Sequence, residues 1–330
     1  MSAGAELSAA SRPATPRAAR LGFVKVSPAW PLLIILVVFF TLGNPHFLTP
    51  FNLSSVLRQT VLIGVLAVGL TPLIISGNID LSVGALAGFA ACLIVFLETP
   101  IGVVPAILTT LAACFAIGLF NGLIVEKLAL NSIIVTLAMS KGLRGLTFLV
   151  FGTQTALAPD ANLTGLGNLK LGLVGVDVVV FFVVAILVSQ LLRATVHGIN
   201  TYAIGGNRRA ALDAGVDVSW HVLMNFALSG AMAGLVGLIL VAELGAASPV
   251  YGQDYELWAV IAVVLGGTRL AGGRGGVLGS IVAALSLTIL RNGMNLMRIE
   301  VRYVLIIMGV VLIAALIFDR LRSGEPETAE

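Results

Sequence analysis

The sequence predicts an all-α, polytopic integral membrane protein, and three observations support that prediction. Apolar residues make up 58% of the 330-residue chain, and charged residues make up only 11%. The mean hydropathy is +1.06. Apolar stretches recur about ten times, and most approach the roughly 20 residues that a helix needs to cross the hydrocarbon core of a bilayer. This pattern leaves no segment for a soluble catalytic or nucleotide-binding domain.

Each apolar stretch is expected to form one transmembrane helix. The expected helices cover residues 30–48, 58–76, 82–98, 101–121, 130–151, 172–192, 219–241, 256–267, 277–292 and 302–318. The eighth is too short to cross alone, and it runs into the glycine-rich segment 266–279. Non-helical backbone, which this many glycines favour, is tolerated at membrane depth only where protein packs around it or where it lines a cavity.

The distribution of basic residues favours an orientation with both termini inside, since lysine and arginine concentrate on cytoplasmic loops. The same basic residues account for the pI of about 9.1, so the pI does not indicate nucleic-acid binding. Residues 1–25 are expected to be a disordered cytoplasmic tail, residues 26–320 the membrane domain, and residues 321–330 a short cytoplasmic tail. Cys92 and Cys114 lie in apolar stretches, where isolated cysteines are typical packing residues.

The segment from Ser76 to Gly84 contains glycine, asparagine and aspartate between two apolar stretches. Asp80 or Ser82 is suited to cap the following helix by accepting its free N–H groups. One interpretation is a tight turn between two transmembrane helices. The other is a discontinuous helix beside a pathway through the membrane, because an aspartate at membrane depth is costly without a role. The sequence alone leaves both open.

The loop from Arg193 to Val218 contains a predicted short helix at 208–214. Asn207 precedes it as a good N-cap, and Gly215 follows it as a good C-terminal glycine. A capped helix in a cytoplasmic loop is either a plain connector or a docking element for a soluble partner. Replacing Gly205 or Gly206 by a bulky residue is expected to disturb this element.

The third polar segment runs from Tyr255 to Gly279 and is dense in glycine. It lacks the spacing of a phosphate-binding loop, so nucleotide binding is not expected there. Its glycines permit a re-entrant turn between two half-length helices, and the segment is a candidate counterpart of 77–84 in a second repeat.

No set of residues in the sequence indicates catalysis or a metal site. The three histidines, His46, His197 and His221, are scattered. Arg144, Arg291 and Asn292 lie near expected outer ends, where they either contact a hydroxylated solute or, for the arginines, extend toward the interface.

These segments resemble the ribose-type sugar permeases of ATP-binding-cassette importers. The main matches are Gly77–Gly84 to the G-x-I-D-L-S-V-G motif, Tyr202–Gly215 to the cytoplasmic G-G-N loop, and Tyr255–Gly275 with Asn292–Leu296 to the long C-terminal motif. Shorter matches lie at Asn121-Gly122, Thr136-Leu137 and Leu143–Thr147. The matches run in order from about residue 30 to about residue 320.

The resemblance implies a multi-pass permease subunit of the bacterial inner membrane, with about ten helices, that works as a homo- or heterodimer. It implies an ATPase subunit inside, which uses ATP and Mg²⁺, and a periplasmic sugar-binding protein outside. The permease would have no active site or cofactor of its own. The residues implied in coupling to the ATPase are Gly205, Gly206, Asn207, Arg208, Arg209, Ala211 and Gly215. The candidates for the translocation pathway are Gly77, Asn78, Asp80, Ser82, Asn121, Arg144, Glu256, Gly266, Gly267, Thr268, Asn292 and Asn295.

The chain departs from the family pattern at two places. Arg208 and Leu212 replace an acidic residue and an arginine, which suggests an ATPase with compensating charge. Trp258 stands where an aspartate commonly follows Tyr-Glu-Leu. A monosaccharide or small polyol is the expected cargo, with nucleosides or branched-chain amino acids as the alternative. An ion-driven secondary transporter is the alternative from a different class, although most carboxylates lie near loops or helix ends.

Overall fold

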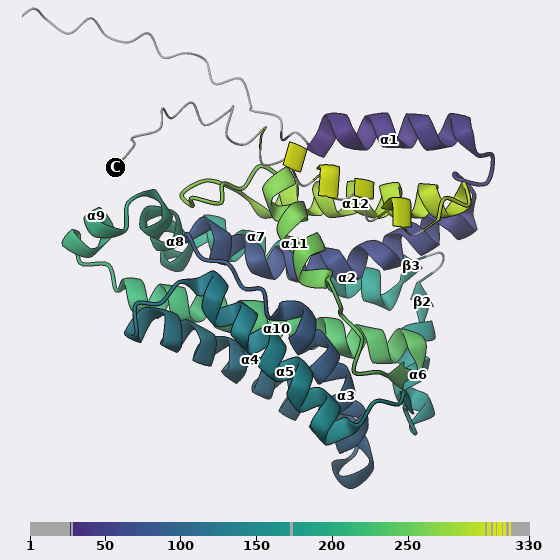
Figure 1. The fold of residues 1–330 in the computed structure, drawn as a ribbon, viewed down its shortest axis with the longest axis horizontal. Coiled ribbons are helices and arrows are strands. Elements are labelled where there is room, and N and C mark those ends of the chain that lie inside the picture. The colour runs from purple at the N-terminus through teal and green to yellow at the C-terminus, as the bar shows by residue number, and fades with distance from the viewer. Residues whose placement is uncertain are drawn as a thin grey trace, which may run out of the picture.

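The computed structural model describes residues 27, 29–171 and 174–300, together with scattered positions between 302 and 317. Within these residues the chain is a bundle of helices (Figure 1). The long helices are α2 (Pro50–Ile75), α3 (Val83–Ile101), α4 (Val103–Lys127), α5 (Ser132–Phe151), α7 (Val176–Ala194), α10 (Val218–Leu244) and α12 (Val277–Leu296). Among the described residues, these 7 helices are long and apolar enough to cross a membrane.

The shorter elements lie around and between these helices. The shorter helices are α1 (Ala29–Gly43), α6 (Ala161–Asn168), α8 (Val196–Gly206), α9 (Arg208–Asp213) and α11 (Tyr255–Leu265). Strand β1 (Ala156–Leu157) pairs antiparallel with β4 (Ala246–Ala247), and β2 (Lys170–Leu171) pairs antiparallel with β3 (Val174–Gly175). The predominance of helix confirms the all-α class. In Figure 1, α9 lies at one end of the bundle, and α6 with β2 and β3 lies at the other. These are called the α9 end and the β end below.

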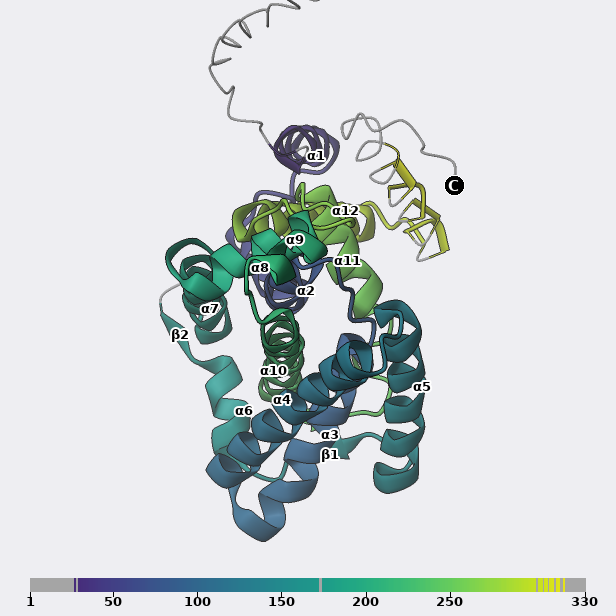
Figure 2. The same ribbon diagram turned by 90° about the vertical axis from the view of Figure 1, so that its left-hand side faces the viewer.

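Helix α2 lies in the middle of the bundle. Seen from the α9 end, it is surrounded by α7, α10, α11 and α12 (Figure 2). In an apolar stretch of 18 residues of this helix, 83% of the residues are buried. Glycines allow this close packing, because Gly64 faces the ring of Phe181 on α7 and Gly69 faces Met232 on α10.

The start of α2 lies eight residues before the expected start at residue 58, so that prediction was wrong. Thr49 caps the helix by accepting a hydrogen bond from the amide of Asn52, and Pro50 occupies the first helical position. Residues 50–57 include Asn52, Ser54 and Ser55, whose polarity hides these two turns from a hydropathy reading.

The prediction of two half-length helices on either side of the glycine-rich segment is right for α11 and wrong for α12, which has 20 residues and is long enough to cross a membrane. Helix α11 has 11 residues, so it is about 16 Å long and too short for a hydrocarbon core of roughly 30 Å. The loop before it enters from the β end and brings the carbonyl oxygens of Tyr251 and Gly252 against Gly88 and Gly84 of α3. The N-terminal ends of α3 and α11 therefore lie next to each other.

The expected tails, residues 1–25 and 321–330, lie outside the described residues. The last expected transmembrane helix, 302–318, is described only at scattered positions, which are helical. The total of about ten transmembrane helices and the orientation with both termini inside stay predictions.

Candidate functional site

The polar segments 193–218 and 255–279 meet at the α9 end of the bundle. Both also contact Ile75, the residue just before the polar segment that begins at Ser76. The amide of Gly273 donates a hydrogen bond of 2.9 Å to the carbonyl oxygen of Ile75, the last residue of α2. Gly205, at the end of α8, packs its backbone against both: a Cβ there would lie 1.7 Å from the same oxygen and 2.5 Å from the Gly273 nitrogen. Only glycine allows three backbones to approach this closely.

The loop 266–276 is shaped to make this contact. Gly272 and Gly273 have φ of +84° and +75°, a region that residues with a side chain rarely adopt. The hydroxyl of Tyr202 on α8 donates to the carbonyl oxygen of Gly275 at 2.9 Å. We call Ile75, Gly205, Gly272 and Gly273 the glycine junction, since they join α2, α8 and this loop.

Helix α9 follows directly after the junction and has the predicted caps. The side chain of Asn207 accepts from the amide of Ala210 at 3.0 Å. Gly215 has φ of +82°, as expected of a glycine that ends a helix. The helix ends at Asp213, one residue before the expected Ala214. Ala211 is buried, whereas Arg209 is exposed on the outer side.

Arg208 of α9 is held by the chain itself. Its guanidinium donates to both carboxylate oxygens of Glu126 on α4, at 3.1 and 2.7 Å. Glu126 is 3% exposed, and it also accepts from Ser219 of α10 at 3.2 Å. A carboxylate of the same chain therefore pairs with Arg208, while the expectation of a compensating charge on an ATPase stays a prediction. The ion pair ties α9 to α4 and α10.

Asp80 lies fully buried in the non-helical segment between α2 and α3. Its carboxylate accepts from the amide of Ser82 at 2.8 Å, from the Ser82 hydroxyl at 2.6 Å, and from Ser229 of α10 at 3.1 Å. Asn121 of α4 donates to the Ser82 hydroxyl at 3.0 Å. Ser229 lies eleven residues into α10, about 16 Å from its start, so this network lies well inside the bundle.

Helix α5 supports the backbone of the same segment. The hydroxyl of Ser132 accepts from the amide of Ile79 at 3.2 Å, and that of Thr136 accepts from the amide of Leu81 at 3.0 Å. Gly77 turns the chain with φ of +85°, and Asn78 next to it is partly buried. Backbone that leaves helical geometry inside a membrane needs such partners, so the segment is a supported break in the helix rather than a plain surface turn.

Arg144 lies in the middle of α5, and its guanidinium donates to the carbonyl oxygens of Pro249 and Tyr251, both at 2.7 Å. It therefore holds the loop before α11. Glu256, in the first turn of α11, packs against Gly84 at the start of α3. Arg144, Glu256 and the Asp80 network thus gather where α3 and α11 begin.

The remaining pathway candidates lie elsewhere. Gly266 packs against the backbone of Gly279, which brings α11 and α12 together. Gly267 has φ of +93°, and Thr268 is fully buried beside Gly275.

Asn292 forms a reciprocal amide pair with Asn52 of α2, at 3.0 and 2.9 Å. It is buried and serves packing between α12 and α2, while Asn295 near the β end is exposed.

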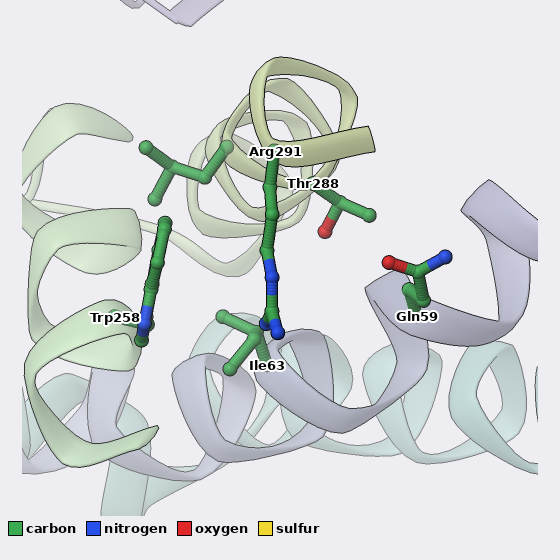
Figure 3. A pocket seen from close by; sticks show the side chains of 6 residues that line it. Gln59, Ile63, Trp258, Thr288 and Arg291 are labelled. Carbon is green, nitrogen blue, oxygen red and sulfur yellow. The ribbon is translucent and has the colours of Figure 1, made fainter. Parts of the chain in front are cut away.

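Besides the pair of Arg208 and Glu126, three contacts were not predicted from the sequence. One is the partner of Asn292, since Asn52 lies 240 positions away. Another is the contact between His197 and His221, whose Nδ1 atoms lie 2.8 Å apart; among the described residues no group of three metal-ligating side chains surrounds them. The third is the position of Arg291 over the ring of Trp258, 5.9 Å from its centre (Figure 3).

Comparisons with known proteins define the class. A family model described as the permease component of the branched-chain amino acid transport system matches residues 52–316. The ribose import permease protein of Bacillus subtilis (strain 168) is 38% identical over 303 residues, which cover 88% of this chain and 92% of that protein. The ribose import permease protein of Escherichia coli (strain K12) is 37% identical, with 87% and 91% covered. No solved structure matches.

A third relative, the L-arabinose permease protein of Azospirillum brasilense, is 32% identical, with 89% of this chain and 88% of that protein covered. The chain is therefore a multi-pass membrane permease. It belongs to the family of importer permease components that the model and these relatives define.

Proposed function

We propose that this chain is the membrane-spanning subunit of an ATP-driven importer that carries a monosaccharide, either a ribose-type pentose or hexose or a related polyol. The names of the relatives support a sugar as cargo, since they include permeases for ribose, D-allose, L-arabinose and xylose. The observation that carries the mechanism is the glycine junction, which connects the short helix α9 to the core helix α2 through backbone contacts alone.

In this proposal α9 docks into a separate ATPase subunit, which uses ATP and Mg²⁺, and a periplasmic binding protein delivers the sugar at the β end. The chain has about ten transmembrane helices in this proposal. Both termini then lie on the cytoplasmic side, and α9 lies on the same side. A second permease copy, identical or homologous, completes the importer in the inner membrane. Movement of α9 reaches α2 and the loop 266–276 through the junction, and reaches α4 through the pair of Arg208 and Glu126.

The pathway residues in this proposal are those gathered where α3 and α11 begin. In secondary transporters discontinuous helices typically form the solute site, and we extend that geometry to the breaks before α3 and α11 of this importer. The network around Asp80 holds the break in place, and Arg144 holds the loop before α11. Both therefore position the pathway rather than define its chemistry.

Two other functions need to be tested. The description of the family model favours branched-chain amino acids, and nucleosides are the other alternative cargo of the same fold. An ion-driven transporter would use a buried carboxylate such as Asp80. However, the carboxylate of Asp80 already accepts three hydrogen bonds from neighbouring serines, which leaves it a poor site for a transported ion.

The first experiment is mass spectrometry of the proteins that copurify with the tagged, gently solubilised chain. A stoichiometric ATPase is the expected result, and a second permease would decide between homo- and heterodimer. Uptake is then measured in proteoliposomes with D-ribose, D-allose, L-leucine and adenosine. ATP-dependent uptake of L-leucine or adenosine alone would overturn the choice of cargo. A chain that purifies alone and moves solute without ATP would overturn the importer.

A further inference from the structure

Helix α5 carries an exposed lysine at its midpoint. Lys141 is the tenth of the 20 residues of α5, so it lies about 14 Å from the first residue of the helix and about 15 Å from the last. Helix α5 is long and apolar enough to cross a membrane, and only 22% of the residues in its apolar stretch are buried. Among the long helices that the structure describes, no other exposed charged side chain lies this far from both helix ends.

The residues beside Lys141 on this face are small. Ala138, Gly142 and Gly145 lie three, one and four positions away, and all three are exposed. A Cβ on Gly142 or Gly145 would meet no atom within 4 Å, so packing within the chain does not require glycine at either position. The middle of α5 therefore presents a shallow surface with one charge on it.

Helix α7, on the opposite side of the bundle in Figure 2, has the surface expected of a helix in contact with lipid. Its exposed side chains include Val179, Phe182, Val183, Ile186 and Leu187, which are all large and apolar. The middle of α5 differs in both size and charge. Contact with lipid therefore accounts for the surface of α7 but not for that of α5.

The ammonium group of Lys141 has no place in hydrocarbon. Its four-carbon stem is too short to carry the charge to a helix end 14 Å away. Among the described residues no carboxylate forms an ion pair with it, although it interacts electrostatically with Glu256 at the start of α11. One carboxylate oxygen of Glu256 is buried without a hydrogen-bond partner in the described part of the chain. Charged side chains at such depth usually face the interior of an assembly or a water-filled cavity.

We propose that the face of α5 around Lys141 is in contact with water and lines the pathway of the solute. This inference depends on the proposed function above, because the second permease copy closes the pathway on its other side. Lys141 keeps the middle of the pathway hydrated, and its three N–H donors offer hydrogen bonds to a polyhydroxylated solute as it passes. The small residues beside it leave room for that solute. The face thus extends the pathway from Arg144 and Glu256 to the outer surface of α5.

The test measures how fast single introduced cysteines react with a water-soluble thiosulfonate, in lipid nanodiscs that hold the chain and the subunits that copurify with it. The thiolate is the reactive species, and a thiol in apolar surroundings stays protonated. Lys141→Cys and Gly145→Cys are expected to react at least 100 times faster than Ile186→Cys, the matched control at similar depth on the exposed face of α7. Cys92 and Cys114 are buried, and the unaltered chain gives their background rate.

The two cysteine positions on α5 make the result decisive. A side chain at Gly145 meets no other atom, so Gly145→Cys reports on the face even if Lys141→Cys folds poorly. Reaction of both as slow as that of Ile186→Cys overturns the proposal and assigns the face to lipid or to a dry contact with the second copy. ATP-driven sugar uptake in the same preparation would then still support the proposed function.

Two variants that differ in polarity test the role of the lysine in passage. Uptake is measured with D-ribose, D-allose, L-arabinose and xylose at equal amounts of chain in the membrane. Lys141→Met keeps the length of the side chain but not its polarity, and it is expected to lower uptake at least fivefold. Lys141→Gln stays polar and is expected to keep most of the uptake, and Ile186→Met is the control that leaves it unchanged. Unchanged uptake in Lys141→Met overturns the role of Lys141, whereas no ATP-driven uptake of any sugar by the unaltered chain overturns the proposed function itself.

Discussion

A single methyl group on Gly205 is expected to separate ATP hydrolysis from uptake, while the same change on the neighbouring Gly206 has no such effect. The Cβ of Gly205→Ala would lie 1.7 Å from the carbonyl oxygen of Ile75, whereas nothing lies within 4 Å of a Cβ on Gly206. To reach an ordinary contact of 3.4 Å, α8 must move away by about 1.7 Å. The structure thus separates two glycines that the sequence treats alike.

The cost of Gly205→Ala has three parts. Overpacking costs about 1–3 kcal/mol, and loss of the hydrogen bond between Gly273 and Ile75 leaves buried groups unsatisfied at about 1–3 kcal/mol. Alanine returns about 1 kcal/mol through its better helix propensity. The net cost of keeping the glycine junction closed is about 3 kcal/mol, which shifts the equilibrium between closed and open junctions roughly 100-fold.

The assay measures sugar uptake and ATP hydrolysis together in proteoliposomes that contain equal amounts of each variant. Gly205→Ala is expected to lower the sugar carried per ATP at least tenfold, while the ATPase still copurifies. Gly206→Ala is the matched control and keeps the ratio of the unaltered chain. An unchanged ratio in Gly205→Ala, or an equal loss in both variants, refutes the junction as the mechanical link.

Three further predictions concern the other contacts. Arg208→Glu and Glu126→Arg are each expected to lower uptake severalfold, because each leaves two like charges facing each other. The double variant forms the ion pair again with the charges exchanged, so it is expected to restore most of the uptake. Uptake per ATPase copy measures this, and a double variant no better than either single variant contradicts the prediction. Asp80→Ala is expected to destabilise the chain by about 3 kcal/mol or more, because three donors lose their acceptor; a melting temperature equal to that of the unaltered chain in detergent would show the network to be dispensable. Arg144→Ala is expected to speed amide hydrogen exchange in residues 250–252 at least tenfold, since the carbonyls of Pro249 and Tyr251 lose their hydrogen bonds to the guanidinium. Unchanged exchange rates would mean that other contacts hold the loop.

Hydropathy and local capping predicted much of the fold. The long apolar stretches correspond to the long helices, and the half-length α11 was expected from its short length and the glycines after it. The start of α9 followed from Asn207 and its end from Gly215, because caps are local signals. The start of α2 was missed because its first two turns are polar, although Thr49 and Pro50 carry a start signal.

Contacts between distant positions were beyond the sequence reading. Arg208 and Glu126 are 82 positions apart, so nothing local indicates that they pair. The different surroundings of Gly205 and Gly206 depend on where Ile75 and Gly273 lie in space. The candidate site was therefore predictable as a set of segments, while the role of each side chain depended on the packing between them.

Helix α12 is attached to α2 near both of its ends. Its first residue, Val277, follows the glycine junction, where the amide of Gly273 binds the carbonyl oxygen of Ile75 at the end of α2. Asn292 lies fifteen residues further along α12, about 22 Å away, and pairs with Asn52 near the start of α2. The two helices are therefore expected to move as a single body, so that a displacement at the α9 end is carried to the β end rather than absorbed between them.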